Sequence, residues 1–477
     1  MNESDSERIA TIAEDLNYSL AISIEESDLI IINSCSIRQK AEDRVVGMGK
    51  KIAELKLQNP DIKVILTGCM AKRDARDHQV DKEELKNPKF SSEEKYHAYL
   101  KKVMQWLDFI LPINEMHKLG KYLNLEIPVN IEEYLSVMPK SKKKFSQWIP
   151  ISTGCNKFCT FCIVPFSRGR EIYRPYAEIF AEIQNAISSG AKEIILLGQN
   201  VNSWRGIFPS LLVKEVVSGK SKYIESSDPH RLLKHEMPEN MLDFADLMDK
   251  IGNYADKYID ETGKHIWIKF TSAHPYDIDE KLIDVVNNHK SIAKQFHFAM
   301  QSGSDSVLRR MNRHYKIDDF IKKCELIRTK IDNVGISTDV IVGFCGETED
   351  EFDQTKNVIE NLKFDQAFIS EYSNRKGTVA ARVYKDDVPN DVKSNRKTEL
   401  NFVLGEGNLE RNKKMVGKDF TILVYKKSKS GFVGRTENGK DVILADNNLT
   451  IGEFVNAEIT GYTNWSLSGK SKIKSLI

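Results

Sequence analysis

Short apolar runs alternate with longer helical patterns through the middle of the chain. Six runs have the length of buried β-strands: Gln147–Ile151, Glu193–Leu197, Ile266–Phe270, Phe296–Met300, Ile336–Val342 and Gln366–Glu371. The segments between them are long enough for crossover helices. One such helix is predicted over Asp319–Ile331, where Phe320, Cys324 and Ile327 recur at helical spacing, so Cys324 is expected in the core. Repeated βα units predict parallel strands in a barrel or partial barrel, with chemistry at their carboxyl ends.

Two more buried-strand runs occur near the start of the chain, and each precedes a cysteine. Cys35 follows Leu29–Asn33, and Cys69 follows Lys63–Thr67. If these strands are parallel neighbours in an α/β sheet, both thiols emerge at one edge, where such sheets bind ligands. The alternative is a pair of structural thiols, because cysteine is commonly buried.

The segment before these strands has the pattern of a helix. Ser4-Asp5-Ser6-Glu7 matches a capping box, and Ile9, Ile12 and Leu16 supply an apolar face. A βα alternation would instead begin with a strand, and the loop behind that strand could hold a third cysteine. We therefore expect that a first strand and its loop are missing from the start of the chain.

The C-terminal region has the pattern of a small β-barrel. Phe432–Thr436 and Asp441–Leu444 flank Asn438-Gly439, which predicts a two-residue hairpin, and Phe454–Thr460 alternates like a further strand. Residues 413–477 carry eleven Lys and Arg against six Asp and Glu, whereas residues 1–139 carry nineteen against twenty-four. Small barrels of this kind commonly bind oligonucleotides. Phosphate contacts are predicted for Lys426, Lys427, Arg435 and Lys440.

Composition restricts the class of protein. A chain of 477 residues is expected to form two or three domains. A net charge of +1 indicates no overall attraction to nucleic acid, so only the basic C-terminal region favours a polyanion. Seven cysteines are not typical of a disulfide framework, and they favour a reducing compartment. Because the chain shows neither a signal peptide nor a long apolar run, we expect a cytoplasmic protein without a membrane anchor.

The strongest chemical signal is the spacing CxxxCxxC formed by Cys155, Cys159 and Cys162 after the first barrel strand. Three thiolates can hold three irons of a 4Fe–4S cubane and leave the fourth iron open to a small molecule. A zinc knuckle is the alternative, but zinc sites usually pair two short motifs, and the next downstream histidine is His230.

These cysteines, with Phe161 just before the third, resemble those of the radical SAM enzymes. The whole chain resembles the radical SAM methylthiotransferases, and within that group the members that modify tRNA. The resemblance runs nearly end to end through these stretches: Asn33 to Glu42, Thr67 to Ala71, Gly154 to Glu171, Leu196 to Asn202, Gln301 to Asp305, Ser337 to Asp339, Val342 to Phe344, and Tyr372-Ser373. It implies an α/β fold with three expected parts: an N-terminal methylthiotransferase domain (1–138), a partial (βα)6 TIM-like radical SAM barrel (145–400) and a C-terminal TRAM barrel (413–477).

The resemblance also implies the chemistry. The Cys155, Cys159 and Cys162 cluster would reduce S-adenosylmethionine to a 5′-deoxyadenosyl radical, which removes hydrogen from carbon 2 of N6-(dimethylallyl)adenosine at position 37, next to the tRNA anticodon. No side-chain base can break that bond, so no catalytic residue is expected beyond the cluster ligands. A second, auxiliary 4Fe–4S cluster on Cys35 and Cys69 would supply sulfur, and a second S-adenosylmethionine the methyl group.

Other contacts are implied more loosely. Phe161, Gly198 and Gln301 are expected near S-adenosylmethionine, the last two because they follow barrel strands. The implied partners are a tRNA anticodon stem-loop and an electron donor such as flavodoxin or ferredoxin, with the protein acting as a monomer. Two other substrates stay open for this family: threonylcarbamoyl-adenosine in tRNA, and an aspartate of a ribosomal protein.

The chain departs from the family pattern in three places. The family has three N-terminal cysteine ligands, and this chain begins just after the place of the first, so an inactive RNA-binding iron–sulfur protein is a further alternative. Residues from about 205 to 239 form a long insertion rich in Ser, Lys and Glu. Cys345 stands where the family usually has proline, and Ala273 splits a usual Ser-His pair.

Overall fold

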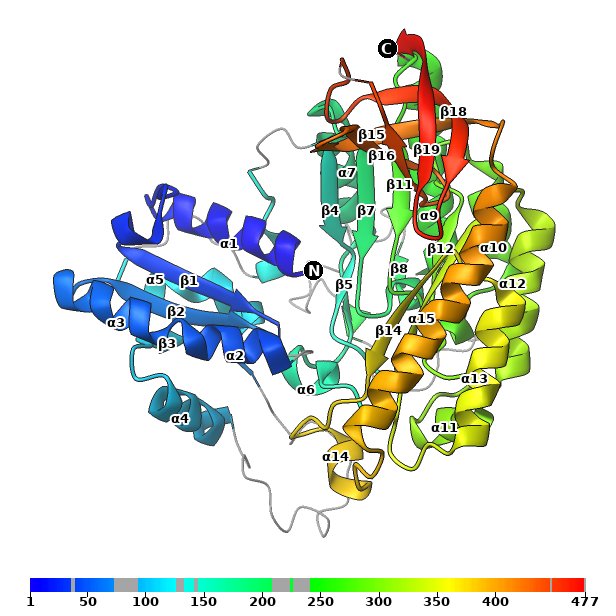
Figure 1. Ribbon diagram of the computed structural model, residues 1–477. Coiled ribbons are helices and arrows are strands. Elements are labelled where there is room, and N and C mark those ends of the chain that lie inside the picture. Colours follow the sequence, from blue (N-terminus) through cyan, green and yellow to red (C-terminus); the bar gives the residue numbers. More distant parts are fainter. Residues whose placement is uncertain are drawn as a thin grey trace.

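Six parallel strands form the centre of the molecule (Figure 1). The computed structural model describes residues 1–35, 39–72, 93–125, 133–140, 145–207, 224–225, 241–446 and 448–475, so most of the predicted insertion at about 205–239 lies outside the described residues. The central strands are β4 (Ser146–Pro150), β7 (Glu193–Leu197), β11 (Trp267–Phe270), β12 (Gln295–His297), β13 (Gly335–Val342) and β14 (Gln366–Glu371). All six predicted strands are thereby confirmed.

The six strands make one curved wall, as the sequence predicted. Hydrogen bonding orders them β11-β7-β4 and β12-β13-β14, and the parallel bridges Ile268↔Ile292 and Ala273↔Phe298 join the two halves. Strands β4 and β14 are the edges of a partial barrel. The outer helices are α7 (Tyr176–Ser188), α9 (Phe244–Thr262), α10 (Glu280–Asn288), α12 (Ile317–Lys330) and α13 (Glu349–Leu362). Alternate strand residues pack against these helices in the main core, which also contains Cys324, as predicted.

One strand is shorter than expected. Strand β12 ends at His297, although the pattern predicted strand as far as Met300. The Met300 amide donates to the Thr338 side-chain hydroxyl at 2.9 Å instead of to a backbone carbonyl of the neighbouring strand. A side-chain acceptor therefore interrupts the ladder at the carboxyl end of the barrel.

The N-terminal domain is a three-stranded parallel sheet in the order β1-β2-β3, with helices around it. Its elements are α1 (Asn2–Asp15), β1 (Leu29–Ser34), α2 (Gln39–Gly47), α3 (Gly49–Gln58), β2 (Lys63–Gly68), α4 (Glu93–Val103) and β3 (Phe109–Ile110). Strands β1 and β2 are paired in register, with Ser34 opposite Gly68. The prediction that these strands are parallel neighbours is confirmed, and Cys35 and Cys69 leave the sheet at the same edge.

The predicted capping box at the start of the first helix is wrong. Helix α1 already begins at Asn2, so Ser4 and Asp5 lie inside it, and both are fully buried. The Asp5 carboxylate accepts hydrogen bonds from the Tyr134 hydroxyl at 2.7 Å and from Arg168 at 2.5 Å. The hydroxyl of Ser4, the predicted cap, is buried and has no hydrogen-bond partner within the described residues, so it does not cap the helix.

A buried ionic network joins helix α1 to the barrel. Arg8 contacts Glu182 of α7 at 2.8 Å, and Arg174 contacts the other oxygen of that carboxylate at 2.7 Å. The three side chains are at most 6% exposed. One carboxylate thus forms ion pairs with two guanidinium groups that come from different domains.

Removing that carboxylate should destabilise the protein strongly. The Glu182→Gln variant removes the carboxylate that both buried guanidinium groups contact most closely, and breaking a buried pair in this way typically costs about 3–5 kcal/mol. Urea unfolding followed by circular dichroism measures the change. Glu178→Gln on the same helix is the matched control, because Glu178 is partly exposed and its contact with Arg174 is long, at 3.9 Å. This substitution should lower the free energy of unfolding by less than about 1 kcal/mol. Equal effects of the two substitutions would contradict this account.

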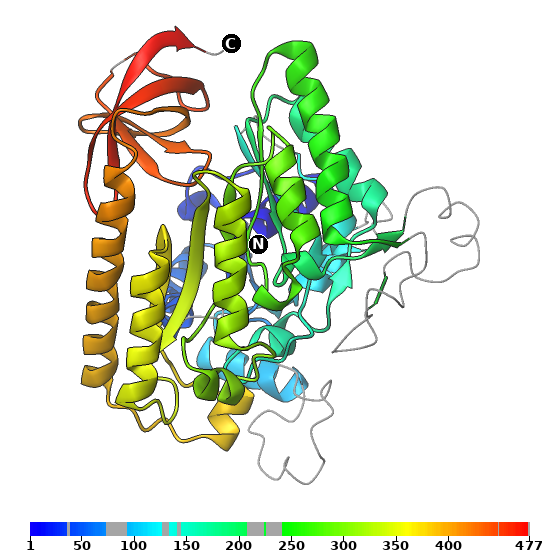
Figure 2. The same ribbon diagram turned by 90° about the vertical axis from the view of Figure 1, so that its right-hand side faces the viewer.

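The C-terminal strands close into a barrel in the order β15-β16-β17-β19-β18. They are β15 (Asp419–Ser428), β16 (Gly431–Thr436), β17 (Asp441–Leu444), β18 (Phe454–Tyr462) and β19 (Leu467–Ser475). Helix α15 (Asn390–Lys413) runs along edge strand β14 and leads into this barrel (Figure 2). Leu423 and Phe454 pack on Trp267 and Ala293, so the small barrel covers the amino ends of the central strands.

The predicted hairpin forms, but its loop has three residues instead of two. The Thr436 amide donates to the Lys440 carbonyl at 3.0 Å, which leaves residues 437–439 as the loop, with Gly439 at φ +87°. The Asn438 side chain donates to the carbonyl of Asn333 at 2.8 Å. The loop is therefore shaped by its contact with the central barrel as well as by its own sequence.

Across the described ranges, no helix has the length and apolar character needed to span a membrane.

Candidate functional site

The three cysteines of the CxxxCxxC motif lie on one loop at the carboxyl end of the barrel, between β5 (Ser152–Thr153) and α6 (Val164–Ser167). Gly154, at φ +77°, opens the loop, and a Cβ there would collide with the Arg170 carbonyl, so only glycine fits. The Cys155 amide donates to the Gly169 carbonyl at 3.2 Å, which ties the loop to the segment that returns beneath it.

Burial controls the charge of these thiols. Desolvation raises the pKa of Cys155 well above its usual value, and it raises that of Cys162 to about 12, with the neighbouring thiols adding to the effect. The positive charge of Arg313 opposes the increase in the pKa of Cys162. The Arg313 guanidinium also donates a hydrogen bond to the Cys159 sulfur at 3.4 Å. Iron binds the thiolate form, so loading of a cluster here would release protons.

The loop offers the donors that an iron–sulfur cluster uses. Cys155, Cys159 and Cys162 are free thiols, and a cubane binds each thiolate at a different iron. The donor set of three thiols on one loop therefore fits a 4Fe–4S cluster.

Buried acceptor oxygens surround the same end of the barrel. Ser152 Oγ, Gln199 Oε1, Asn200 Oδ1 and Gln301 Oε1 are buried and have no hydrogen-bond partner within the described part of the chain. Unpaired buried acceptors are uncommon in folded proteins. S-adenosylmethionine carries ammonium, ribose hydroxyl and adenine amino donors, so this set of acceptors fits the cofactor.

The structure places the three predicted cofactor-contact residues around this end. Gly198 directly follows strand β7, and a Cβ there would lie 2.6 Å from the Ser152 hydroxyl and 3.1 Å from the Val201 Cα, so a larger residue would displace its neighbours. Gln301 has φ +71°, and its backbone is held between Asp339 and Ile341 by hydrogen bonds of 2.8 and 2.9 Å. Phe161 is partly buried against a cluster that includes Cys345. Each residue lies near the cysteine loop or at a strand end, and its contact with the cofactor stays a prediction.

Sequence reasoning did not identify a buried carboxylate beside the loop. Glu171 accepts from the Tyr173 hydroxyl at 3.1 Å and from the Ser203 hydroxyl, and burial raises its pKa to about 7. The neighbouring ion pair of Lys157 and Asp277 spans 2.7 Å. The only available signal was the position of Glu171 directly after Arg168-Gly169-Arg170 in the stretch that resembles the family.

An arginine connects Cys69 of the N-terminal domain to the segment that follows the cysteine loop. Arg168 follows the cysteine loop, and its Nε donates to the sulfur of Cys69 at 3.2 Å while its Nη2 holds Asp5. Cys69 is buried, with 3% of its surface exposed. Cys35 is partly exposed at the same sheet edge, and residues 36–38 after it lie outside the described residues. Cys69 therefore faces the loop that carries the other three cysteines.

The four cationic side chains predicted to bind RNA do not share one environment. Lys426 and Lys427 are exposed on β15. Arg435 is 42% exposed in its side chain and pairs with Asp441 at 2.9 Å. The prediction that Lys440 contacts phosphate is wrong. Its side chain is buried and contacts Asp365 at 3.0 Å and Asn408 at 2.6 Å, because the hairpin docks on the central barrel. Lys440 therefore has no place on an RNA-facing surface.

Three family models match the chain. Residues 1–87 match the family described as "Uncharacterized protein family UPF0004", residues 149–359 match the Radical SAM superfamily, and residues 413–472 match the TRAM domain. These matches fall on the N-terminal sheet, the central barrel and the C-terminal barrel, respectively.

Curated relatives match along nearly the whole chain. Proteins named tRNA-2-methylthio-N(6)-dimethylallyladenosine synthase are similar in Clostridium botulinum, at 33% identity over 98% of this chain and 94% of that protein, and in Dictyoglomus thermophilum, at 34% over 98% and 96%. Among solved structures, the radical S-adenosylmethionine methyltransferase TsrM from Kitasatospora setae, with cobalamin and a [4Fe-4S] cluster bound, superposes with a TM-score of 0.43 at 11% identity, over 78% of this chain and 68% of that one.

Proposed function

The chain belongs to the family of tRNA-2-methylthio-N6-dimethylallyladenosine synthases, which are radical SAM methylthiotransferases, and from this membership we propose its reaction. It attaches a methylthio group to carbon 2 of N6-(dimethylallyl)adenosine in tRNA, at position 37 next to the anticodon. The observation that carries the proposal is the loop of Cys155, Cys159 and Cys162 at the carboxyl end of a partial barrel, opposite Cys69 of the N-terminal domain.

The family membership implies one 4Fe–4S cluster and S-adenosylmethionine. When bound, they supply a 5′-deoxyadenosyl radical that can remove hydrogen from an unactivated C–H bond. Cys155, Cys159 and Cys162 would hold the cluster, and Arg313 would donate a hydrogen bond to one of its thiolates. The unpaired oxygens at the strand ends, including those of Gln199 and Gln301, would bind the cofactor's donor groups and orient it.

We assign an auxiliary cluster, which supplies sulfur, to Cys35 and Cys69. The support is their shared sheet edge and the hydrogen bond from Arg168 to Cys69. Arg168 follows the radical cluster's loop, so it would keep the two clusters at a constant separation. The ion pair of Arg8 with Glu182 fixes helix α1 on the barrel and would also keep the separation of the two clusters constant.

The C-terminal barrel and the partners complete the proposal. A TRAM domain together with tRNA-modifying relatives supports an RNA substrate, and we assign phosphate contacts to Lys426, Lys427 and Arg435. The adenine must leave its stack to reach the barrel, which is easier in an anticodon loop than in a duplex. Since one chain holds both the cysteines and the RNA-binding domain, we propose a cytoplasmic monomer that receives electrons from a flavodoxin or ferredoxin.

Reconstitution tests the function directly. The full chain, loaded with iron and sulfide without oxygen, is supplied with dimethylallyl-modified tRNA, S-adenosylmethionine and a reductant, and the nucleosides are measured by mass spectrometry. We expect the 2-methylthio nucleoside. If 5′-deoxyadenosine forms without that nucleoside, the protein performs only the radical step. Methylthiolation of threonylcarbamoyl-adenosine or of a ribosomal protein in place of this substrate would overturn the assignment.

A further inference from the structure

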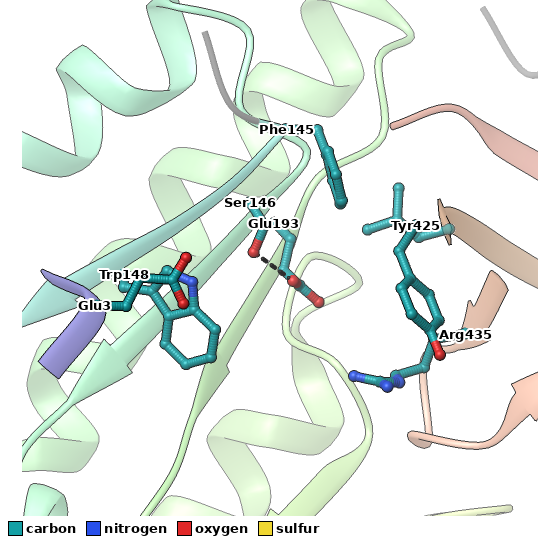
Figure 3. Close-up of a pocket in the computed structure, with 8 residues that line it drawn as sticks. Glu3, Phe145, Ser146, Trp148, Glu193, Tyr425 and Arg435 are labelled. Atoms are coloured by element: carbon teal, nitrogen blue, oxygen red, sulfur yellow. Dashed lines mark hydrogen bonds between the residues drawn. The ribbon is translucent and has the colours of Figure 1, made fainter. Parts of the chain in front are cut away.

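A cavity of about 310 Å³ lies where the three domains meet. We call it the interdomain cavity and define it by its lining residues: Glu3, Phe145, Ser146, Trp148, Glu193, Leu423, Tyr425 and Arg435 (Figure 3). Helix α1 contributes one residue, the first two barrel strands and the residue before them contribute four, and the C-terminal barrel contributes three. Its volume is in the range of sites that bind small organic groups.

Aromatic faces dominate the walls. Trp148 lies on one side and Tyr425 on the other, with Phe145 between them at the top of the view (Figure 3). Trp148 and Tyr425 are only partly buried. Any of the nucleobases can stack on an aromatic side chain. Aromatic side chains that stack with successive bases are typical of proteins that bind single-stranded nucleic acid.

Two charged side chains of the cavity, Glu193 and Arg435, form ion pairs with neighbouring residues. The Glu193 carboxylate accepts hydrogen bonds of 2.6 Å from Lys269 and from the Ser146 hydroxyl. Arg435 stacks over the Tyr425 ring at 4.8 Å while it pairs with Asp441. The remaining lone pairs of Glu193 can accept from the N–H edge of a base, and the half-exposed guanidinium can contact a phosphate.

The cavity is separate from the cysteine loop. Phe145 and Ser146 lie at the amino end of β4 and Trp148 is its middle residue, whereas Cys155 follows beyond the carboxyl end of that strand. None of the residues that line the cavity belongs to the cysteine loop. We therefore take a nucleotide in the cavity to be a different one from the nucleotide whose carbon 2 reacts. It would lie a few positions away along the same strand.

Two exposed cations of the C-terminal barrel directly follow a residue that lines the cavity. Tyr425 is followed on β15 by Lys426 and Lys427, both of which are exposed. A strand of RNA whose phosphates contact these lysines would present its bases to the mouth of the cavity. Aromatic walls inside and phosphate-binding cations outside are the two elements of a single-strand binding site.

We propose that the interdomain cavity binds a second, unstacked nucleobase of the RNA substrate, between Trp148 and Tyr425. The inference rests on the proposed RNA-modifying function. By holding a base at a distance from the reacting adenine, the site fixes the register of the strand. It makes the choice of tRNA depend on a nucleotide other than the modified one.

Fluorescent base substitution tests this with the full, cluster-loaded protein. Each loop position of a dimethylallyl-modified anticodon stem-loop is replaced in turn by 2-aminopurine, whose emission is quenched by aromatic stacking. We expect quenching on binding at one position outside the modified adenosine. Trp148→Leu and Tyr425→Leu should abolish that quenching and weaken binding roughly 5- to 100-fold, which corresponds to the stacking of one base. Phe402→Leu, an exposed aromatic on α15 outside the cavity, should change neither.

Two further measurements separate this role from others. The double variant Lys426→Ala/Lys427→Ala should weaken the binding of every stem-loop to a similar extent and reduce the salt dependence of binding. The position at which 2-aminopurine is quenched should stay the same. Formation of 5′-deoxyadenosine by the Trp148 variant shows that its barrel is intact. Binding with no quenched position, or quenching that survives in both cavity variants, overturns the inference alone. Failure of the wild type to bind RNA overturns the proposed function as well.

Discussion

Replacing Cys159 with alanine should abolish the cleavage of S-adenosylmethionine by this protein. Cys159 is the middle thiol of the loop, and it alone among the three accepts a hydrogen bond from the buried Arg313 within the described structure. Loss of an outer partner of a metal ligand already costs about 10- to 100-fold in affinity or activity, so loss of the ligand itself should exceed ~100-fold. The measurement is 5′-deoxyadenosine released per chain under reductant, together with iron bound per chain.

Cys324→Ala is the matched control for that variant. Cys324 is fully buried between helix and sheet in the barrel core, far along the chain from the motif. Removing its sulfur leaves a small cavity and a modest loss of stability, but iron content and 5′-deoxyadenosine formation should stay near the wild-type level. If Cys159→Ala keeps its iron and still cleaves S-adenosylmethionine, the assignment of this loop to the radical cluster is wrong.

Replacing Cys69 with alanine should separate the two halves of the reaction. The radical cluster on Cys155, Cys159 and Cys162 stays intact, so 5′-deoxyadenosine should still form. The 2-methylthio nucleoside should fall by ~100-fold or more, because the cluster that we assign to Cys35 and Cys69 would lose a ligand. Iron content should decrease from about eight to about four atoms per chain if both clusters assemble in the wild type.

Arg168 provides the comparison for the Cys69 variant. Its guanidinium donates to the Cys69 sulfur and binds Asp5 at 2.5 Å, so Arg168→Lys keeps the charge but loses the directed contact with both groups. This variant should retain its iron and show a smaller loss of product than Cys69→Ala. A Cys69→Ala protein that makes the full amount of product would exclude Cys69 as a ligand that the sulfur transfer requires.

Local patterns in the sequence were enough to predict the central strands and the loop of Cys155, Cys159 and Cys162. The period of two in the strands and the helical spacing around Cys324 depend only on which residues face the core. The six central strands were therefore predicted in the right order, although β12 ends earlier than predicted. The cysteine loop was recognisable because its three thiols are close in sequence. The shared edge of Cys35 and Cys69 followed from the direction of two adjacent strands.

The polar partners were decided only by the tertiary structure. Ser4 to Glu7 looked like a capping box, yet Asp5 within it binds Arg168, which is 163 residues away. Lys440 looked like a phosphate contact, yet it is buried against Asp365. Glu182 joins Arg8 to Arg174 across two domains. A charged side chain can pair with any opposite charge that the fold brings near it. Apolar burial is set by the chain's own periodicity, whereas the partner of a buried charge depends on how distant segments pack.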